Sequence, residues 1–213
     1  MTARTRGLTG TRPRRFAGIV WRAIGTRFLG SALALAGSRE RGGRFNPPGA
    51  FETLYVVLSP GTALAERDGI LLSAAGIDAA PRLRTAVLLR IACRLEAVLD
   101  LNDQRIRARL DLPLAELLGP WLAWDTAAAG GLPPTQALGA MVHASQRFEA
   151  ILYPSTKDAT GRCLALFPDR LRVGSTLVVD DPDGAVRAAL RAPFRHRPRR
   201  ARRGQRGGPG SRQ

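Results

Sequence analysis

Four polar residues lie beside short apolar segments, at places where folding could gather them into one site. Arg44, Tyr55 and Glu66 follow one another at intervals of eleven residues, and Ser155 follows another apolar run. A guanidinium can bind phosphate oxygens through two parallel hydrogen bonds. A carboxylate can stabilise positive charge that develops in a reaction, and a phenol or a hydroxyl can orient a ligand. These four residues are the first candidates for chemistry.

Two further polar residues join this set. Arg22 lies within the first apolar run, and Asn46 lies in a long Gly/Pro-rich loop that also carries Arg44. A loop of this length between ordered elements is often functional. Each of the six residues also has an ordinary structural interpretation, such as the polar side of a strand, a core aromatic or a turn residue. Taken singly, they do not decide between a site and a scaffold.

The sequence does not support other familiar kinds of site. It has no Walker A loop and no GxGxxG motif after a strand. His143 and His196 have no cysteine or histidine at ligand spacing, so we expect no metal and no Ser-His-Asp triad. Cys93 and Cys163 lie in apolar runs, which predicts buried free thiols in a reducing cytoplasm. No apolar run reaches the roughly 20 residues that span a bilayer, so we expect no membrane contact.

The formal charge of +16 is concentrated at the two ends of the chain. Residues 1–15 hold five arginines and residues 193–213 hold eight, both without an acidic residue, which leaves a net charge of +3 for the middle. The sequence therefore predicts a basic disordered segment over 1–15, one folded domain over 16–192 and an Arg-rich disordered tail over 193–213. Such basic ends can contact nucleic acids non-specifically.

The hydropathy pattern predicts strands and helices in an irregular order. Residues 89–101 alternate apolar and charged side chains, which is typical of a half-exposed strand. Ser59 and Pro60 are expected to open a helix. This order predicts an α+β fold, not a doubly wound sheet. The expected strands cover 16–24, 54–58, 89–101, 150–153, 163–167 and 176–179, and the expected helices cover 62–72, 102–119 and 135–147.

Two blocks of the sequence resemble the signature of the RES domain family. The first is GGRFNPPGAFETLYVVLSPGTALAE at residues 42–66, and the second is YPST at 153–156, which CLALF follows at 163–167. The family shows a G-G-R-[WF]-N-x-x-G loop, then a strand with a tyrosine, then a helix that ends in A-L-x-E. The resemblance covers about residues 16–180, and several blocks agree in order and spacing. Phe45 stands where the family often has tryptophan, and the Arg-rich tail is not part of the pattern.

The resemblance implies a toxin of a bacterial type II toxin–antitoxin system. RES proteins have an ADP-ribosyltransferase-like core of mostly antiparallel strands with flanking helices. They deplete NAD by cleaving the bond between nicotinamide and ribose, by hydrolysis or by phosphorolysis, without a metal. An Xre-like helix-turn-helix antitoxin covers the active site, and the complex is usually oligomeric. By this resemblance NAD is the substrate, the antitoxin is the partner and the protein is cytoplasmic.

The resemblance also implies roles for the candidate residues. Glu66 would stabilise positive charge on the ribose, and Arg44, assisted by Arg22, would bind the pyrophosphate. Tyr55 would offer a flat face to nicotinamide or a hydroxyl to the ribose, and Ser155 would provide a small hydrogen-bonding group. The expected catalytic residues are Arg44, Glu66 and Ser155, and the expected NAD-binding residues are Arg22, Arg44, Asn46, Tyr55 and Ser155.

Three alternatives stay open at the level of the sequence. A protein ADP-ribosyltransferase would use the same NAD-binding residues and a protein acceptor. A nucleic-acid-binding protein would act through its basic ends, although no recognition helix is evident. An inactive relative would keep the signature residues without the activity.

Overall fold

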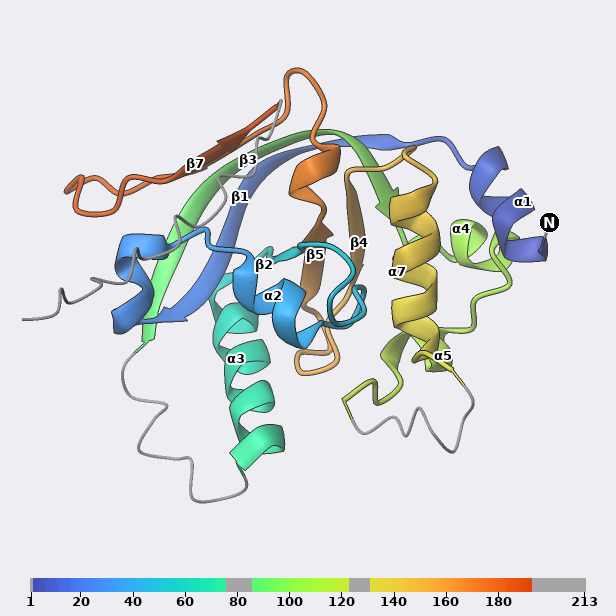
Figure 1. The fold of residues 1–213 in the computed structure, drawn as a ribbon, viewed down its shortest axis with the longest axis horizontal. Coiled ribbons are helices and arrows are strands. Elements are labelled where there is room, and N and C mark those ends of the chain that lie inside the picture. The colour runs from blue at the N-terminus through green and yellow to red at the C-terminus, as the bar shows by residue number, and fades with distance from the viewer. Residues whose placement is uncertain (1, 76–85, 123–130, 193–213) are drawn as a thin grey trace, which may run out of the picture.

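A mixed sheet forms the centre of the protein (Figure 1). The computed structural model describes residues 2–75, 86–122 and 131–192, without the side chains of 69–75; the Arg-rich tail expected over 193–213 lies outside the described residues. Seven strands pair in the order β1-β2-β5-β4-β3-β6-β7, and β1 also pairs with β3. The strands are β1 (Arg14–Gly25), β2 (Leu54–Val57), β3 (Ala86–Asp100), β4 (Ala150–Pro154), β5 (Arg162–Leu166), β6 (Thr176–Val179) and β7 (Ala189–Arg191).

The two partners of β1 close five of these strands into a circuit. β1 lies along β3 from Phe16 to Gly25, and Trp21 of β1 also pairs with Val57 of β2. From β2 the pairing continues through β5 and β4 back to β3. Every pairing is antiparallel except that of β3 with β4. The α+β class with mostly antiparallel strands and flanking helices is thus confirmed.

The long strand β3 has two parts with different surroundings. From Leu89 to Leu95 every second side chain is buried and the side chains between are exposed, as the alternating sequence predicts. Beyond this part every side chain from Ala97 onward is buried. The reason is that β4 pairs with this end of β3, where Val98 packs into one core cluster and Leu99 into another.

Apolar side chains fill the two faces of the sheet in two separate clusters. The first cluster joins residues such as Val20 of β1 and Ile91 of β3 with Leu33 and Leu35, which follow the short helix η1 (Thr26–Ser31). The second cluster contains Leu138 of helix α7 together with residues of β4 and β5. The sheet therefore separates two cores, and a side chain's position along a strand decides which core it enters.

Helices α1, α4, α5 and α7 gather at one end of the sheet, while α2 and α3 lie nearer the other end (Figure 1). The helix expected over 102–119 is two short helices, because Asp111 takes a left-handed φ of 49° and Pro113 follows it. The helix expected to open at Ser59 and Pro60 is confirmed as α3. The helices are α1 (Ala3–Gly10), α2 (Ala36–Arg41), α3 (Pro60–Ala75), α4 (Gln104–Arg109), α5 (Leu114–Leu118), α7 (Pro134–Ala144) and the one-turn η3 (Pro168–Arg170).

Helix α1 docks onto the body of the protein, so the expectation of disorder at the N-terminal end is wrong for this segment. Arg4 forms two hydrogen bonds of 2.7 Å with the carboxylate of Glu116. Gly7 lies so close to Arg109 that a Cβ atom would be 2.2 Å from the Arg109 carbonyl oxygen. Leu8 is buried. These partners lie about a hundred residues further along the chain, as the separation of 112 between Arg4 and Glu116 shows, so local composition does not reveal them.

A buried carboxylate holds β3 where it changes partners along one edge. β6 pairs with β3 as far as Arg94, and β4 pairs with it from Val98 onward. The Glu149 carboxylate fills the gap between them, because its Oε1 accepts hydrogen bonds from the backbone N–H groups of Glu96 and, at 2.8 Å, Ala97. The carboxylate thus replaces a strand partner at the fork, which is our name for residues 95–97 of β3, between the part that pairs with β6 and the part that pairs with β4.

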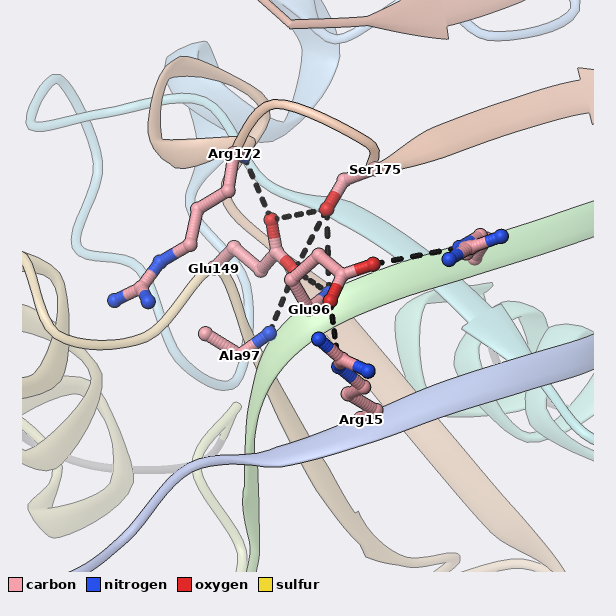
Figure 2. Close-up of polar contacts among 7 residues, drawn as sticks. Arg15, Glu96, Ala97, Glu149, Arg172 and Ser175 are labelled. Atoms are coloured by element: carbon pink, nitrogen blue, oxygen red, sulfur yellow. Dashed lines mark hydrogen bonds and ion pairs between the residues drawn. The ribbon is translucent and has the colours of Figure 1, made fainter.

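The segment before β6 closes the other side of the same carboxylate (Figure 2). The hydroxyl of Ser175 lies 2.9 and 2.8 Å from the two carboxylate oxygens of Glu149. The backbone N–H of Arg172 donates to Oε2 at 2.8 Å. Since Glu149 is fully buried, these donors replace water around its charge.

Replacing Gly7 or Gly10 by alanine should separate helix propensity from helix docking. Alanine favours a helix over glycine by roughly 1 kcal/mol. Gly10→Ala should be neutral or slightly stabilising, because no atom lies within 4 Å of the added Cβ. Gly7→Ala should lower stability by about 1–3 kcal/mol, because the Cβ collides with the backbone of α4. Equal effects of the two substitutions in thermal unfolding would contradict the docking of α1.

Glu149→Gln should destabilise the protein by about 3 kcal/mol. The substitution replaces one accepting oxygen by an NH₂ group, so that a donor faces the backbone N–H donors. Urea unfolding followed by circular dichroism measures this loss. Glu96→Gln is the matched control, since its carboxylate contacts the surface residues Arg15 and Arg94. It should cost less than about 1 kcal/mol. A smaller loss for Glu149→Gln than for Glu96→Gln would show that the fork does not depend on this carboxylate.

Candidate functional site

The Gly/Pro-rich loop after α2 is held in shape by Asn46 and Tyr55. The Tyr55 hydroxyl donates to Asn46 Oδ1 at 2.8 Å and accepts from the backbone N–H of Phe45 at 2.9 Å. The fully buried Asn46 also donates from Nδ2 to a carbonyl of α2 at 2.7 Å. Backbone hydrogen bonds between Gly43 and Asn46 close the turn. The loop therefore has a defined shape at its tip.

Helix α7 lies directly against this loop. A Cβ atom on Gly139 of α7 would be 1.8 Å from the carbonyl oxygen of Phe45, so only glycine permits this approach. Gln136 of α7 donates from Nε2 to the carbonyl of Gly43 at 3.0 Å. Because the helix and the loop touch through their backbones, α7 fixes the position of Arg44.

The guanidinium of Arg44 bridges two segments that lie far apart in the sequence. Its Nη1 donates to the carbonyl oxygens of Leu117 at 3.0 Å and Gly119 at 3.1 Å. Its Nη2 lies 3.5 Å from the hydroxyl of Thr156, next to Ser155. These contacts use three of the five N–H donors of an arginine and leave capacity for a ligand.

Glu66 and Ser155 meet across the boundary between α3 and the loop after β4. The Ser155 hydroxyl donates to Glu66 Oε1 at 2.5 Å and accepts from the backbone N–H groups of Lys157 and Asp158, each at 3.0 Å. The Cys163 thiol lies 3.6 Å from the same oxygen. Among the described residues, no hydrogen bond reaches Glu66 Oε2.

Burial keeps one thiol and one phenol of this region uncharged. Burial raises the pKa of the Cys163 thiol, and the negative charge of Glu66 raises it further. Burial also raises the pKa of Tyr55, against the opposing effects of the Phe45 N–H and the Arg44 charge. The phenol and the thiol are thus neutral hydrogen-bonding groups at neutral pH.

Arg22 lies apart from the other candidates. It occupies the same side of β1 as Val20 and Ile24, which belong to the first core cluster, whereas Tyr55 packs against the second. Its guanidinium donates to the carbonyls of Ala32 at 3.0 Å and Ala34 at 3.5 Å. Burial lowers the pKa of Arg22 to about 10, so it stays charged at neutral pH. In this structure Arg22 holds the segment after η1.

The structure therefore joins Arg44, Tyr55, Asn46, Glu66 and Ser155 in one region and leaves out Arg22. Several contributors to this region were not among the residues expected from the sequence. Thr156 and Cys163 lie inside the sequence blocks that carry the family resemblance, so their neighbourhood was visible from sequence. The contact between Thr62 and Asp158, at 2.6 Å, had no signal in the sequence.

Other kinds of site find no support in the part of the chain that the structure describes. No group of three or more His, Cys, Asp or Glu side chains there is arranged to hold a metal ion. His143 instead stacks on Phe51, with ring centroids 3.9 Å apart, and bonds Asp169 at 2.9 Å. Within residues 2–75, 86–122 and 131–192, no helix is long and apolar enough to cross a bilayer.

Comparisons with known proteins agree with the motif blocks and the fold. The RES domain family model matches residues 19–189. Among solved structures, the chain is similar to a chain of the M. tuberculosis MbcT–MbcA toxin–antitoxin complex, with a TM-score of 0.64 and 20% sequence identity. That similarity covers 85% of this chain and 91% of the other. No curated protein matches the sequence.

Tyr55→Phe should loosen the loop that carries Arg44. The substitution removes the hydroxyl and leaves Asn46 Oδ1 and the Phe45 N–H without that partner, which should cost about 1–2 kcal/mol in urea unfolding. Asn46→Ala should be destabilising too, and the double substitution should cost less than the sum of the two. Additive losses would mean that the two side chains do not act as one unit.

Proposed function

The chain belongs to the RES domain family, and we propose that it is the toxin of a toxin–antitoxin pair and depletes NAD by cleaving the bond between nicotinamide and ribose. The family match over residues 19–189 and the fold shared with a chain of the MbcT–MbcA complex support this proposal. The acceptor of the ADP-ribose would be water or phosphate.

One arrangement supports this function above all. Arg44, Glu66 and Ser155 come from three separate segments, which are connected by hydrogen bonds of Ser155 and of its neighbour Thr156. The Ser155 hydroxyl bonds Glu66 at 2.5 Å, and Arg44 reaches the hydroxyl of the next residue, Thr156, at 3.5 Å. A guanidinium, which we propose binds phosphates, and a carboxylate, which we propose faces a sugar, therefore contact neighbouring residues of one loop.

The cleavage needs little acid assistance, because nicotinamide leaves NAD as a neutral molecule. The bond between ribose C1′ and the nicotinamide nitrogen breaks, its electron pair stays with nicotinamide, and positive charge develops on the ribose. We propose that Glu66 stabilises this charge and that Ser155 orients the Glu66 carboxylate. Water or phosphate then forms the new bond at C1′; when water is the acceptor, it releases one proton to the solvent in this step.

Arg44, Tyr55 and Arg22 differ in the part that we propose for them in binding NAD. We propose that Arg44 binds the pyrophosphate with the N–H groups that its backbone partners leave unused. Tyr55 would support this loop and offer its ring to nicotinamide, since its hydroxyl already bridges Phe45 and Asn46. Arg22 would act on NAD only indirectly, through the segment that it holds.

The proposed partner is an Xre-like helix-turn-helix antitoxin that covers this region, within an oligomeric complex in the cytoplasm. One leucine lies exposed beside Arg44. Leu118 is 36% exposed and lies between the two residues whose carbonyl groups accept hydrogen bonds from Arg44. An exposed apolar side chain beside a polar centre favours a protein partner. Ion pairs engage Arg4 with Glu116 and Arg15 with Glu96, which weakens the case for nucleic acid contact at the N-terminal end.

Nicotinamide release by the purified protein tests the proposal. Glu66→Gln and Arg44→Ala should each lower kcat/KM by about 100-fold or more, because each removes a charge that the transition state needs. Glu40→Gln and Arg41→Ala are matched controls on exposed residues close to Arg44, and they should keep the activity of the unsubstituted protein. Cellular NAD should fall after induction of the unsubstituted protein or of either control, and it should stay unchanged after induction of Glu66→Gln or Arg44→Ala.

Labelled NAD distinguishes the acceptors. Label in free ADP-ribose indicates hydrolysis, and label in a phosphorylated ADP-ribose indicates phosphorolysis. Label attached to protein would indicate protein ADP-ribosylation and would contradict the proposal that water or phosphate accepts the ADP-ribose. A folded protein that releases no nicotinamide, and that leaves the NAD pool unchanged, would exclude the proposed function.

A further inference from the structure

The first turn of α3 carries a second polar contact to the loop that holds Ser155. Thr62 is fully buried, and its hydroxyl donates to Asp158 Oδ2 at 2.6 Å. The same hydroxyl lies 2.7 Å from that of Ser59. Since Thr62 has a single proton and gives it to a carboxylate, Ser59 is the donor in that second bond. A directed chain of hydroxyls thus runs from the start of α3 to Asp158.

Thr62 and Glu66 lie on one face of α3, because residues four apart in a helix are neighbours. Asp158 and Ser155 likewise share one loop, three residues apart. The Glu66–Ser155 contact and the Thr62–Asp158 contact therefore connect the same two segments, one helical turn apart. Two contacts at this spacing resist a tilt that either contact alone would allow.

The loop of residues 155–161 is rigid through its own hydrogen bonds. Ser155 Oγ accepts from the N–H of Asp158 at 3.0 Å, and Asp158 Oδ1 accepts from the N–H of Thr160 at 3.1 Å. Backbone bonds of 2.9 Å join Gly161 to both Asp158 and Ser155. A movement of Asp158 is therefore passed on to Ser155.

The two segments leave no room between them at this point. A Cβ atom on Gly161 would lie 2.7 Å from Asp158 Oδ2 and 2.7 Å from the hydroxyl of Thr62. The absence of a side chain on Gly161 lets the hydroxyl and the carboxylate meet. Asp158 is partly exposed, so we expect the contact to add little to global stability.

We infer that Thr62 and Asp158 are positioning residues of the site, which set the distance and angle between Glu66 and Ser155. They act through α3 and the loop of residues 155–161 and do not need to touch the substrate. This inference rests on the proposed function for its kinetic consequence. Its structural consequence, a looser boundary between α3 and this loop without the pair, can be measured independently.

Substitutions that keep or remove the contact test its kinetic role in the full chain. Thr62→Val preserves the shape and removes the hydroxyl, and Asp158→Ala removes the acceptor. Both should lower kcat for nicotinamide release by about tenfold or more, while KM stays within about threefold, because a misplaced reacting group slows the chemical step. Thr62→Ser and Asp158→Asn keep a hydrogen-bonding group and should restore most of the activity.

The two cysteines provide a readout that does not depend on NAD. Cys163 lies beside Glu66 at the boundary between the segments, whereas Cys93 lies in the other core cluster. Both are buried, so a thiol reagent reaches them only when the structure opens. Thr62→Val should speed the labelling of Cys163 by about tenfold and leave that of Cys93 unchanged, with mass spectrometry identifying each site.

Local loosening at the boundary and global destabilisation give different labelling patterns. Equal acceleration at both cysteines, together with a lower Tm, would mean that the pair only supports global stability. Unchanged kcat and unchanged labelling in Thr62→Val and Asp158→Ala would overturn the inference. If the unsubstituted protein releases no nicotinamide, the proposed function fails, and the labelling of Cys163 against Cys93 still decides whether the pair holds the boundary.

Discussion

The Glu149 carboxylate allows one edge of β3 to serve two strands. β6 pairs with one part of that edge and β4 with another, and backbone N–H groups between them need an acceptor. A side-chain carboxylate provides it inside the core, surrounded by donors from β3 and from the segment before β6. The position of β4 depends on this fork, and Ser155 follows β4 directly. The geometry of the site therefore depends on a buried charge that takes no part in its chemistry.

The site itself is built from close backbone contacts as much as from functional side chains. Gly139 brings α7 against the loop of Arg44, and Gly161 lets Thr62 approach Asp158. Where backbones touch, a side chain elsewhere on the same segment has little freedom to shift. This explains how Arg44, whose guanidinium contacts two carbonyl groups and one hydroxyl, is held in a defined place.

The sequence predicts this protein well where a local pattern determines the structure. The alternation over 89–101 identifies β3, and Ser59 with Pro60 identifies the start of α3, because period and capping are properties of neighbouring residues. Local patterns do not reveal α1, whose stability comes from contacts with Glu116 and Arg109. Nor do they show that α4 and α5 are separate helices.

The family resemblance, and not spacing alone, identifies the candidate residues. Their proximity depends on the pairing of β2 with β5 and of β4 with β5, which no local pattern specifies. The sequence also could not show that Arg22 faces the first core cluster, since the side of a strand is known only once its partners are. The Thr62–Asp158 contact is hidden from local patterns for the same reason, because its members are 96 residues apart.

The antiparallel pairing of β2 with β5 joins residues 54–57 to residues 163–166. During synthesis, Arg44 and Glu66 leave the ribosome long before the strand that completes their surroundings. Until β5 emerges, β2 lacks this neighbour, and the loop that carries Ser155 has no anchor at its far end. The nascent chain thus exposes apolar segments early and gains a complete site late, which makes the interval between the synthesis of β2 and that of β5 the one in which this fold is most open to aggregation or to capture by another protein.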